Sequence, residues 1–483
     1  QRLTPSDFPL AKKAGLDQSL LDQLAGEPDF EDVLPLTSLQ QGLAYESWSR
    51  GEDRKADPYH VQIAVELKGS LDVAQLKTAF EEIVTRHQIL RLTLPLATIE
   101  RGLGLYRSLP IDWRVETAQG RQLEEILTED HSGAFDLGRG PLIRARVIKH
   151  DDIRHTLILS NHHAVLDGWS TPILLSELSA LYQGYSLGPV IEWRDHLAWV
   201  FSREREKSLA YWRDCFSGAE GSNALPLVAP NTQEVGMGEH IVALPTDLTG
   251  KIESFAREHG LTLSTVFEGA FMLLLARLGN RSEVTIGVTR NGRSADRLEI
   301  DRAIGLYIGT LPLRAEVCLG APLIEWLKSL QQEQAGQEEH SHISLSDIQR
   351  CADMYGGCKD RGVNLFDALF VYENYPIDEH VKEFSEEITI GSVLGLDGTH
   401  YPLALAVMPG KDTLLRFTFD RMSVDEAAVV SFSEQLSLLL EKFIHTQAPS
   451  RLGDLTVLLD TDRHKVIELF NDTQQEIPNT TLP

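Results

Sequence analysis

Several classes of protein are disfavoured by what this sequence has little of. It contains only 4 cysteines in 483 residues. None of them forms a CxxC pair, so the thiols indicate neither a disulfide framework nor a zinc site. No apolar run is long enough to cross a membrane. Acidic residues outnumber basic ones by 71 to 45, and the net charge of −26 disfavours nucleic acid or an anionic membrane as a partner. We therefore expect a reduced, cytoplasmic protein that binds no metal, nucleic acid or membrane.

The length of the chain indicates more than one compact unit. Single hydrophobic cores stop growing at about 250–300 residues. A chain of 483 residues therefore predicts two or more lobes. The hydrophobic content of 42% and the charged content of 24% are those of ordinary globular proteins. The sequence begins with Gln1 rather than Met, and we expect it to be a segment of a longer polypeptide.

The most informative stretch is S-N-H-H-A-V-L-D-G-W-S, residues 160–170. Before it, apolar residues alternate in 156–159, which predicts a short buried strand. After it, Ser170 is a good N-cap for a helix whose apolar residues recur at helical spacing up to Gly184. The stretch is therefore predicted to be a strand-to-helix loop, in which a rigid frame can hold reactive side chains.

Four residues of this loop carry the chemical interest. Successive side chains along a strand point to opposite faces, so we expect one of His162 and His163 to face a cavity and the other the interior. Asp167 has no cation near it in sequence, and if buried it needs a positively charged partner from elsewhere in the chain. Gly168 allows the backbone to approach a ligand closely. The alternative is a tight turn with two incidental histidines.

Alternating and helical patterns predict a similar order of elements in the two halves of the chain. The first half has a predicted strand at 61–67 and an amphipathic helix at 73–84. The second has a strand at 241–244 and helices at 248–258 and 265–278. The other predicted elements are a helix opening on a capping box of Ser38 and Gln41, a bridging helix near 204–212, a strand at 284–288, three strands within 385–420 and a helix at 424–443. The similarity hints at a duplicated lobe.

The sequence H-H-A-V-L-D-G at 162–168 resembles the HHxxxDG active-site motif of the condensation domains of nonribosomal peptide synthetases. The same superfamily contains CoA-dependent acyltransferases such as chloramphenicol acetyltransferase. Five further stretches resemble motifs of the family and follow its order: 36–43, 86–91, 193–199, 304–314 and 365–376. The chain departs from the family pattern at Gly309, where the family usually has asparagine.

This resemblance implies an α/β fold. Two chloramphenicol-acetyltransferase-like lobes, each of α+β two-layer construction, would form a pseudo-dimer in a V with a central tunnel. Residues 31–205 would be the N-terminal lobe with the HHxxxDG motif and 206–455 the C-terminal lobe. Because both ends of the chain resemble linkers of the family, residues 1–30 would lead in from a carrier or other domain. Residues 456–483 would lead towards an adenylation domain.

The resemblance also implies roles for individual residues. His163 would be the catalytic histidine, supported by His162 and Asp167, and the Gly168 amide is a candidate donor to a developing oxyanion. We expect Asp167 to pair with a buried arginine, Arg293 by first choice and Arg290 by second. The residues expected to bind substrate are Trp169, Ser170, Tyr307, Gly309, Thr310 and Asn374.

The implied reaction is peptide-bond formation between two thioesters. The amine of an acceptor aminoacyl group would attack a donor thioester, each group being carried on the 4′-phosphopantetheine arm of a peptidyl carrier protein. The implied partners are therefore an upstream donor carrier, a downstream acceptor carrier and an adjoining adenylation domain. The chain itself would bind no cofactor and be monomeric when excised. Two alternatives stay open: a free CoA-dependent acyltransferase, and an inactive condensation-like domain that recruits a partner protein.

A finer expectation concerns the stereochemistry of the donor. The forms HHAVLDGWS, GLYIGTLPLR and FDALFVYENYP are similar to those of condensation domains that accept a donor ending in a D-residue and an L-residue acceptor. Dual epimerisation/condensation domains share these forms but carry an additional N-terminal histidine motif, which is absent here.

Overall fold

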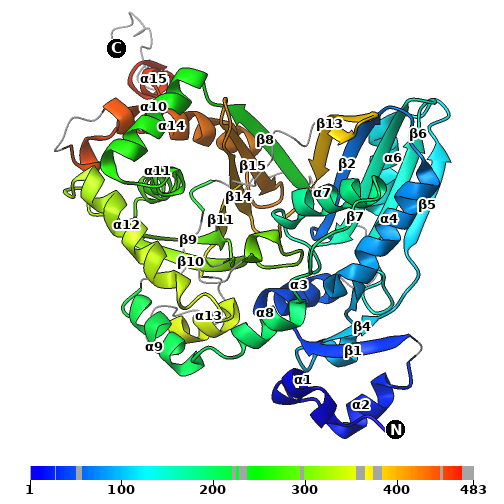
Figure 1. Ribbon diagram of the computed structural model, residues 1–483. Coiled ribbons are helices and arrows are strands. Elements are labelled where there is room, and N and C mark those ends of the chain that lie inside the picture. The colour runs from blue at the N-terminus through cyan, green and yellow to red at the C-terminus, as the bar shows by residue number, and fades with distance from the viewer. Residues whose placement is uncertain are drawn as a thin grey trace, which may run out of the picture.

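The computed structural model describes residues 2–27, 29–49, 57–219, 225–227, 236–293, 299–354, 365–373, 383–396, 398–445 and 450–469. Two six-stranded sheets lie in separate lobes, which face each other across the middle of the molecule and open into a V (Figure 1). Helices pack on both sheets. The α/β fold with two lobes expected from the sequence is confirmed.

The sheet of the first lobe is mixed, with the order β12-β13-β2-β7-β6-β5. Its strands are β12 (Glu383–Ser385), β13 (Ile388–Leu396), β2 (His60–Lys68), β7 (Arg154–His162), β6 (Ile143–Lys149) and β5 (Asp112–Thr117). The helices α4 (Val73–Arg86) and α7 (Ser170–Tyr182) pack against each other and share one hydrophobic core with the sheet. The motif loop leaves the end of the central strand β7 and enters α7.

The second sheet has the order β10-β9-β11-β14-β15-β8. Its strands are β10 (Gly309–Glu316), β9 (Glu283–Arg290), β11 (Ala368–Tyr372), β14 (Leu403–Met408), β15 (Leu414–Asp420) and β8 (Met237–Ala243). The helices α10 (Thr246–His259), α11 (Leu263–Leu278), α12 (Leu323–Glu338) and α14 (Glu426–His445) belong to this lobe. Most of α11 is buried in its core, as its nearly uniform apolar sequence predicts.

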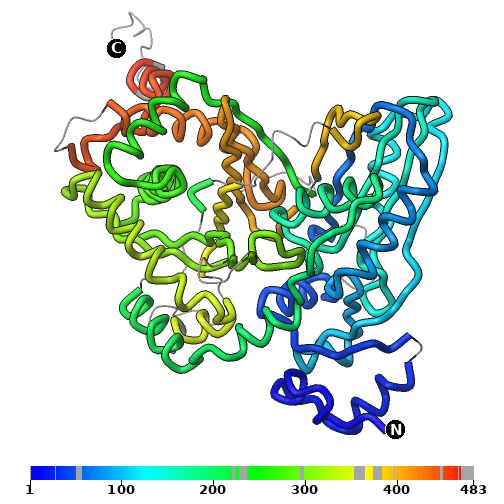
Figure 2. Tube along the Cα trace, viewed as in Figure 1, coloured from blue at the N-terminus to red at the C-terminus, as the bar shows by residue number. Residues whose placement is uncertain are grey.

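Two segments from the second half of the chain are built into the first lobe. Strand β13 pairs antiparallel with β2, in register from Thr389 opposite Lys68 to Leu396 opposite Gln62. Figure 2 shows this stretch lying against the blue β2. The loop at 300–307 adds Ile300, Ile304 and Tyr307 to the core of the first lobe. The expected boundary between residues 205 and 206 therefore does not divide the chain into two self-contained lobes.

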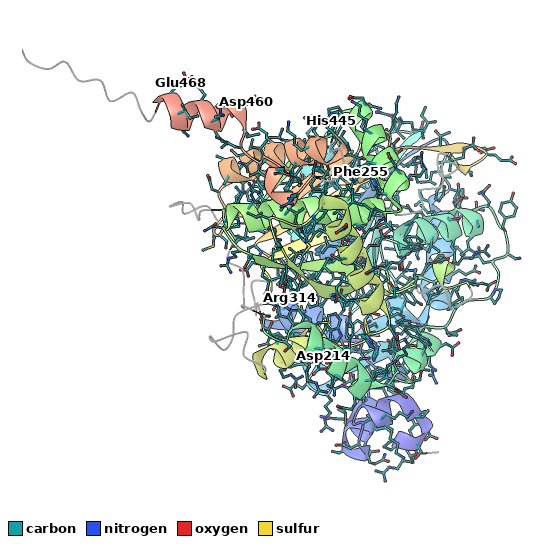
Figure 3. All side chains as sticks on the ribbon, turned by 90° about the vertical axis from the view of Figure 1, so that its left-hand side faces the viewer. Asp214, Phe255, Arg314, His445, Asp460 and Glu468 are labelled. Atoms are coloured by element: carbon teal, nitrogen blue, oxygen red, sulfur yellow. The ribbon has the colours of Figure 1, made fainter. Side chains whose placement is uncertain are left out.

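The ends of the chain form smaller units. A three-stranded sheet of β1 (Phe30–Pro35), β4 (Leu103–Arg107) and β3 (Leu92–Thr93) carries α1 (Pro9–Lys13) and α2 (Gln18–Leu24) through a separate small core. The first residues are thus packed onto the first lobe. At the other end, the helix that contains Asp460 and Glu468 stands out from the body of the molecule (Figure 3).

Helices α3 (Ser38–Ser49), α8 (Trp193–Val200), α9 (Arg205–Cys215) and α13 (Leu345–Met354) lie at the base of the V, where the chain passes from one lobe to the other between α8 and α9 (Figure 1). The capping box of α3 lies one residue earlier than predicted. The Thr37 hydroxyl accepts from the Gln40 N–H at 3.3 Å, and the Gln40 side chain accepts from the Thr37 N–H at 3.0 Å. The prediction of Ser38 and Gln41 is therefore wrong by one position.

No single helix among the described residues is both long and apolar enough to span a membrane. Helices α10 and α11 reach the required length only as a pair, and that pair is bent by 104°.

Candidate active site

His163 is held at the end of β7 with one ring nitrogen committed to the backbone. Its main-chain N–H donates to the Tyr59 carbonyl at 2.8 Å, and its ring Nδ1 lies 2.8 Å from the Leu166 carbonyl. A carbonyl can only accept, so Nδ1 carries a proton. In the neutral form of the ring, the unshared electron pair is therefore on Nε2. The side chain is half-buried.

His162 points the other way, into the protein. Its side chain is fully buried, Nδ1 accepts from the Ala164 N–H at 3.2 Å, and Nε2 lies 3.0 Å from the Ser47 hydroxyl. The Asp57 carboxylate lies 3.6 Å from the same Nε2. Both nitrogens of His162 are therefore occupied within the fold, whereas Nε2 of the half-buried His163 has no hydrogen bond recorded among the described residues.

Asp57 is the charged group of this buried cluster. Burial raises the pKa of its carboxyl, but hydrogen bonding with His162, the Tyr59 N–H and Ser47 outweighs burial and holds the pKa below its ordinary value. Asp57 is thus ionised at neutral pH beneath the motif. No local pattern in the sequence pointed to this residue, because its role depends on a contact with β7, which lies far along the chain.

Asp167 is buried and fully occupied. Arg293 donates to it in a fork, Nη1 to Oδ2 at 2.8 Å and Nη2 to Oδ1 at 3.0 Å, and both side chains have no exposed surface. Oδ2 also accepts from the main-chain N–H groups of Tyr307 at 2.9 Å and Ile308 at 3.3 Å. Residues from the second half of the chain thus hold the carboxylate of the motif. Both of its oxygens are hydrogen-bonded within the protein.

Ser170 differs from its predicted roles. It is the first residue of α7, with Trp169 at the N-cap. Its buried hydroxyl lies 2.8 Å from Asp167 Oδ1 and 2.9 Å from the Gly305 carbonyl, and it accepts from Arg293 at 3.0 Å. The predicted N-cap is therefore wrong. The assignment of Ser170 to substrate binding is corrected as well, since every direction around its hydroxyl is occupied by the Asp167 cluster.

A cavity of about 1300 Å³ lies between the lobes. Its wall combines Tyr59 and Leu43 of the first lobe with residues at the facing end of the second sheet. Three residues predicted to bind substrate are in this wall: Tyr307, Gly309 and Thr310. His163 is joined to the wall through its hydrogen bond to the Tyr59 backbone.

Two of the remaining predicted residues have partners outside the Asp167 carboxylate. The Trp169 indole donates to the Asp301 carbonyl at 3.0 Å, and its ring lies 5.8 Å from the Arg293 guanidinium carbon. Arg290 pairs with Glu268 at 3.1 Å, which corrects its nomination as the second choice for Asp167. Asn374 lies outside the described residues. No cluster of three or more histidine, cysteine or acidic side chains in the described part of the chain could hold a metal.

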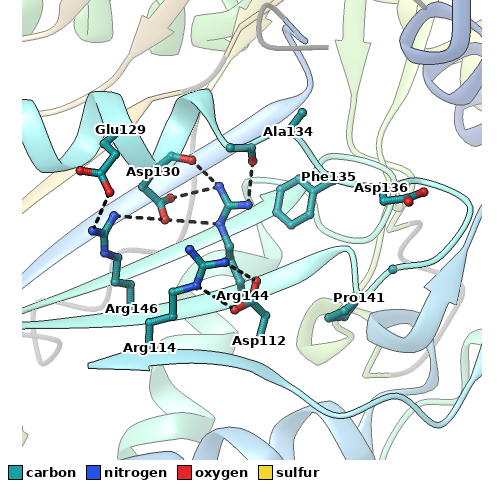
Figure 4. A pocket seen from close by; sticks show the side chains of 12 residues that line it. Asp112, Arg114, Glu129, Asp130, Ala134, Phe135, Asp136, Pro141, Arg144 and Arg146 are labelled. Atoms are coloured by element: carbon teal, nitrogen blue, oxygen red, sulfur yellow. Dashed lines mark hydrogen bonds and ion pairs between the residues drawn. The ribbon is translucent and has the colours of Figure 1, made fainter. Parts of the chain in front are cut away.

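A second, smaller pocket of about 210 Å³ lies at the β5 side of the first sheet (Figure 4). Its charged side chains are paired with one another or with the backbone. Arg144 donates to the Gly133 carbonyl at 2.7 Å and lies 3.4 Å from Asp130, and Arg146 lies 3.2 Å from Glu129. The pocket shares no lining residue with the interlobe cavity. Its charges are thus accounted for by the fold.

Comparison with known proteins identifies the family. The family model of the condensation domain matches residues 30–467. The chain belongs to the condensation-domain family. It is 33% identical over 488 residues to a linear gramicidin synthase of Brevibacillus parabrevis, an alignment that covers 97% of this chain and 9% of that protein. The chain thus spans about a tenth of the length of this relative. The condensation domains of nonribosomal peptide synthetases are amide-forming acyltransferases, and this domain is of that class.

Solved structures share the fold of this condensation domain. A four-domain nonribosomal peptide synthetase bound to AMP and glycine superposes with a TM-score of 0.78 at 16% identity, over 90% of this chain and 35% of that one. The condensation domain from monacolin K polyketide synthase superposes with a TM-score of 0.73 at 20% identity, over 88% of this chain and 100% of that one. These likenesses establish the fold.

The Asp167 cluster predicts a large loss of stability on mutation. Removing one partner of a buried ion pair costs about 3–5 kcal/mol. We expect Asp167→Ala and Arg293→Ala each to lower the melting temperature strongly, measured by thermal unfolding with circular dichroism. Asp151→Ala is the control, because Asp151 forms an exposed pair with Arg154. An Asp167→Ala protein as stable as the control would show that the fold does not depend on the pair.

The Asp57 cluster predicts a pH-dependent contribution to stability. A carboxyl whose folded pKa is depressed stabilises the fold above its unfolded pKa of about 3.9, and that contribution is lost as pH falls through the folded pKa. We expect Asp57→Asn to be less stable than the parent at pH 7 and the difference to shrink below about pH 4. Denaturant titrations at several pH values measure it. A difference that is constant with pH would contradict the assignment.

Proposed function

We propose that this domain forms a peptide bond between a donor peptidyl or aminoacyl thioester and the amine of an acceptor aminoacyl thioester. The observation that carries the proposal is the position of His163. Its Nδ1 proton is held by the Leu166 carbonyl, and its main-chain N–H donates to Tyr59, a residue of the cavity wall. A cavity of about 1300 Å³ has room for two acyl chains to meet inside it.

The chemistry follows from the tautomer of His163. Amide formation from an amine and a thioester requires that the amine lose a proton as its nitrogen attacks the carbonyl carbon and the thiolate leaves. The unshared pair on Nε2 takes or steers that proton, and a positioned general base contributes about 10²–10⁴-fold. Holding the amine and thioester within reach contributes further. The Gly168 amide is assigned to the oxyanion that forms on the donor carbonyl.

The substrates are assigned to carrier proteins on either side of the domain, each delivering a thioester on a 4′-phosphopantetheine arm. An adjoining adenylation domain would be a further neighbour in the same polypeptide. Residues 1–30 and 456–483 are assigned to connecting segments; the family model begins at residue 30 and extends to residue 467, inside the second of these segments. A half-buried His163 that is hydrogen-bonded to Tyr59 of the cavity wall favours a catalyst over a domain that only recruits a partner protein.

The test of the catalytic assignment uses the two neighbouring histidines as a matched pair. We expect His163→Ala to lower single-turnover peptide formation by about 10²-fold or more while the melting temperature stays near that of the parent. His162→Ala removes a fully buried ring and should lower stability together with activity. Product is measured by mass spectrometry of the acceptor carrier.

Two results decide against the proposal. Peptide formation by His163→Ala at the parental rate would remove the histidine from the chemistry. Acyl transfer by the parent from a free CoA thioester, without transfer between two loaded carriers, would assign the domain to the CoA-dependent alternative.

The donor is assigned a D-residue at its C-terminal end and the acceptor an L-residue. The configuration at the α-carbon decides which way the thioester carbonyl faces, and a misplacement of about 1 Å can cost about 10²-fold in rate. Residues 306–310 line the cavity, so they are placed to distinguish the two configurations. The rival interpretation is that these sequence forms only mark descent.

Competition between epimeric donors tests this assignment. We expect a donor carrier loaded with a peptide ending in a D-residue to react faster than its L-epimer when both compete for one L-aminoacyl acceptor. The ratio of products on the acceptor is read by mass spectrometry after chiral derivatisation. Equal rates, or a preference for the L-donor, would refute the stereochemical assignment and leave the condensation reaction standing.

A further inference from the structure

Arg290 lies in the wall of the interlobe cavity and has no part in the Asp167 cluster. It ends strand β9, where it pairs across the sheet with Gly309 of β10. Directly opposed residues of an antiparallel pair project to the same face. Both residues line the cavity, and the Arg290 side chain is 18% exposed. The guanidinium therefore stands beside a position that has no side chain.

The arginine is anchored by a buried carboxylate. Glu268 of α11 has no exposed surface, and its Oε1 accepts from Arg290 Nη1 at 3.1 Å and from the Ser264 hydroxyl at 2.7 Å. Its Oε2 accepts from the Gln334 amide. This carboxylate is held by three donors and cannot follow a moving partner. It fixes Arg290 in place and cancels its charge.

Two donors of Arg290 are left over. Nε and Nη2 are buried and have no hydrogen-bond partner among the described residues. Buried polar groups are nearly always paired, so two unpaired donors on one side chain call for a partner that the protein chain does not supply. Across the strand, a Cβ added to Gly309 would meet no atom within 4 Å. Open space thus lies at Gly309, on the neighbouring strand directly opposite Arg290.

A purely structural ion pair in the same sheet looks different. Arg314 of β10 pairs with Glu283 of β9, and its Nη1 donates to the Cys215 carbonyl at 3.0 Å. Only Nε of Arg314 is left unpaired, and Arg314 is not part of the cavity wall. A buried ion pair gives little net stability over apolar side chains of similar volume. The pair at Arg290 therefore needs a reason beyond stability, and its position in the wall provides one.

We propose that Arg290 binds a carbonyl oxygen of the acyl chain that enters the cavity, and that the open space at Gly309 accommodates the chain. Because Glu268 already neutralises the guanidinium, the pair offers hydrogen bonds without net charge, which suits a neutral carbonyl better than a free carboxylate. The oxygen comes either from an amide of the peptidyl group or from an amide of the pantetheine arm. This inference rests on the proposed function, since it needs an acyl chain in the cavity.

The test is Arg290→Lys, with Arg314→Lys as the matched control. Lysine keeps the charge and one donor for Glu268 but has no equivalent of Nε and Nη2. We expect Arg290→Lys to raise KM for a loaded carrier by about ten- to a hundredfold, which corresponds to the free energy of a hydrogen bond from a charged group. The values of kcat and of the melting temperature should be retained. Arg314→Lys should leave KM unchanged. An unchanged KM in Arg290→Lys, or an equal rise in both variants, would overturn the proposal.

The length of the acyl group distinguishes the two sources of the carbonyl. If the contact is to the peptide, KM rises for a dipeptidyl donor and stays unchanged for an aminoacyl donor, which lacks a peptide amide. If the contact is to the pantetheine arm, KM rises equally for both. Each of these results supports the subsite and names its ligand.

A second variant and a binding measurement keep the test independent of folding and of catalysis. Gly309→Ala fills the open space without a clash and should retain the melting temperature while it weakens binding. Affinity is measured by calorimetry with a carrier whose dipeptidyl group is joined through a non-reacting amide in place of the thioester. Unchanged affinity in both Arg290→Lys and Gly309→Ala would overturn the subsite. A parent that binds this carrier but forms no peptide would refute the proposed function alone.

Discussion

The fork of Arg293 on Asp167 is the interaction on which the geometry of the site depends. It joins the loop that leaves the central strand of the first sheet to the segment that follows β9 of the second. A buried carboxylate is tolerable only when its oxygens are occupied, and the Tyr307 and Ile308 amides complete the set. Those amides belong to the stretch that lines the cavity. One carboxylate therefore fixes both the histidine loop and the opposite wall.

The alternation of side chains along a strand places the two histidines of the motif in different surroundings. Adjacent residues at the end of β7 face opposite ways, so one ring is sealed against Ser47 and Asp57 while its neighbour stays half-exposed. The sealed ring occupies both of its nitrogens inside the protein. In His163, Nδ1 is hydrogen-bonded to the Leu166 carbonyl, so Nε2 is the nitrogen that can accept a proton. The tautomer of His163 is thus set by the main chain.

Local patterns predicted much of this fold, and long-range contacts account for the errors. Alternation and helical spacing located β2, α4, β9, α11 and α14, because each buries one face against a nearby core. The same patterns cannot say that β13 joins the sheet of the other lobe, since pairing partners leave no mark on spacing. Serine is a residue type that often caps helices, yet the Ser170 hydroxyl is hydrogen-bonded within the cluster of Asp167 and Gly305. The pair of Glu268 and Arg290 could not be predicted either. A single glutamate in an apolar helix gives no indication of the distant residue with which it pairs.

The exchange of segments between the lobes also limits how such a domain can be recombined. A chimera joined after residue 205 would take β13 and the 300–307 loop from the second parent, and both would have to fit the sheet and core of the first. Hybrid synthetases assembled at that point would carry mismatched side chains inside the lobe that bears the histidines. Junctions at the chain ends, outside 30–467, leave every strand with its native neighbour.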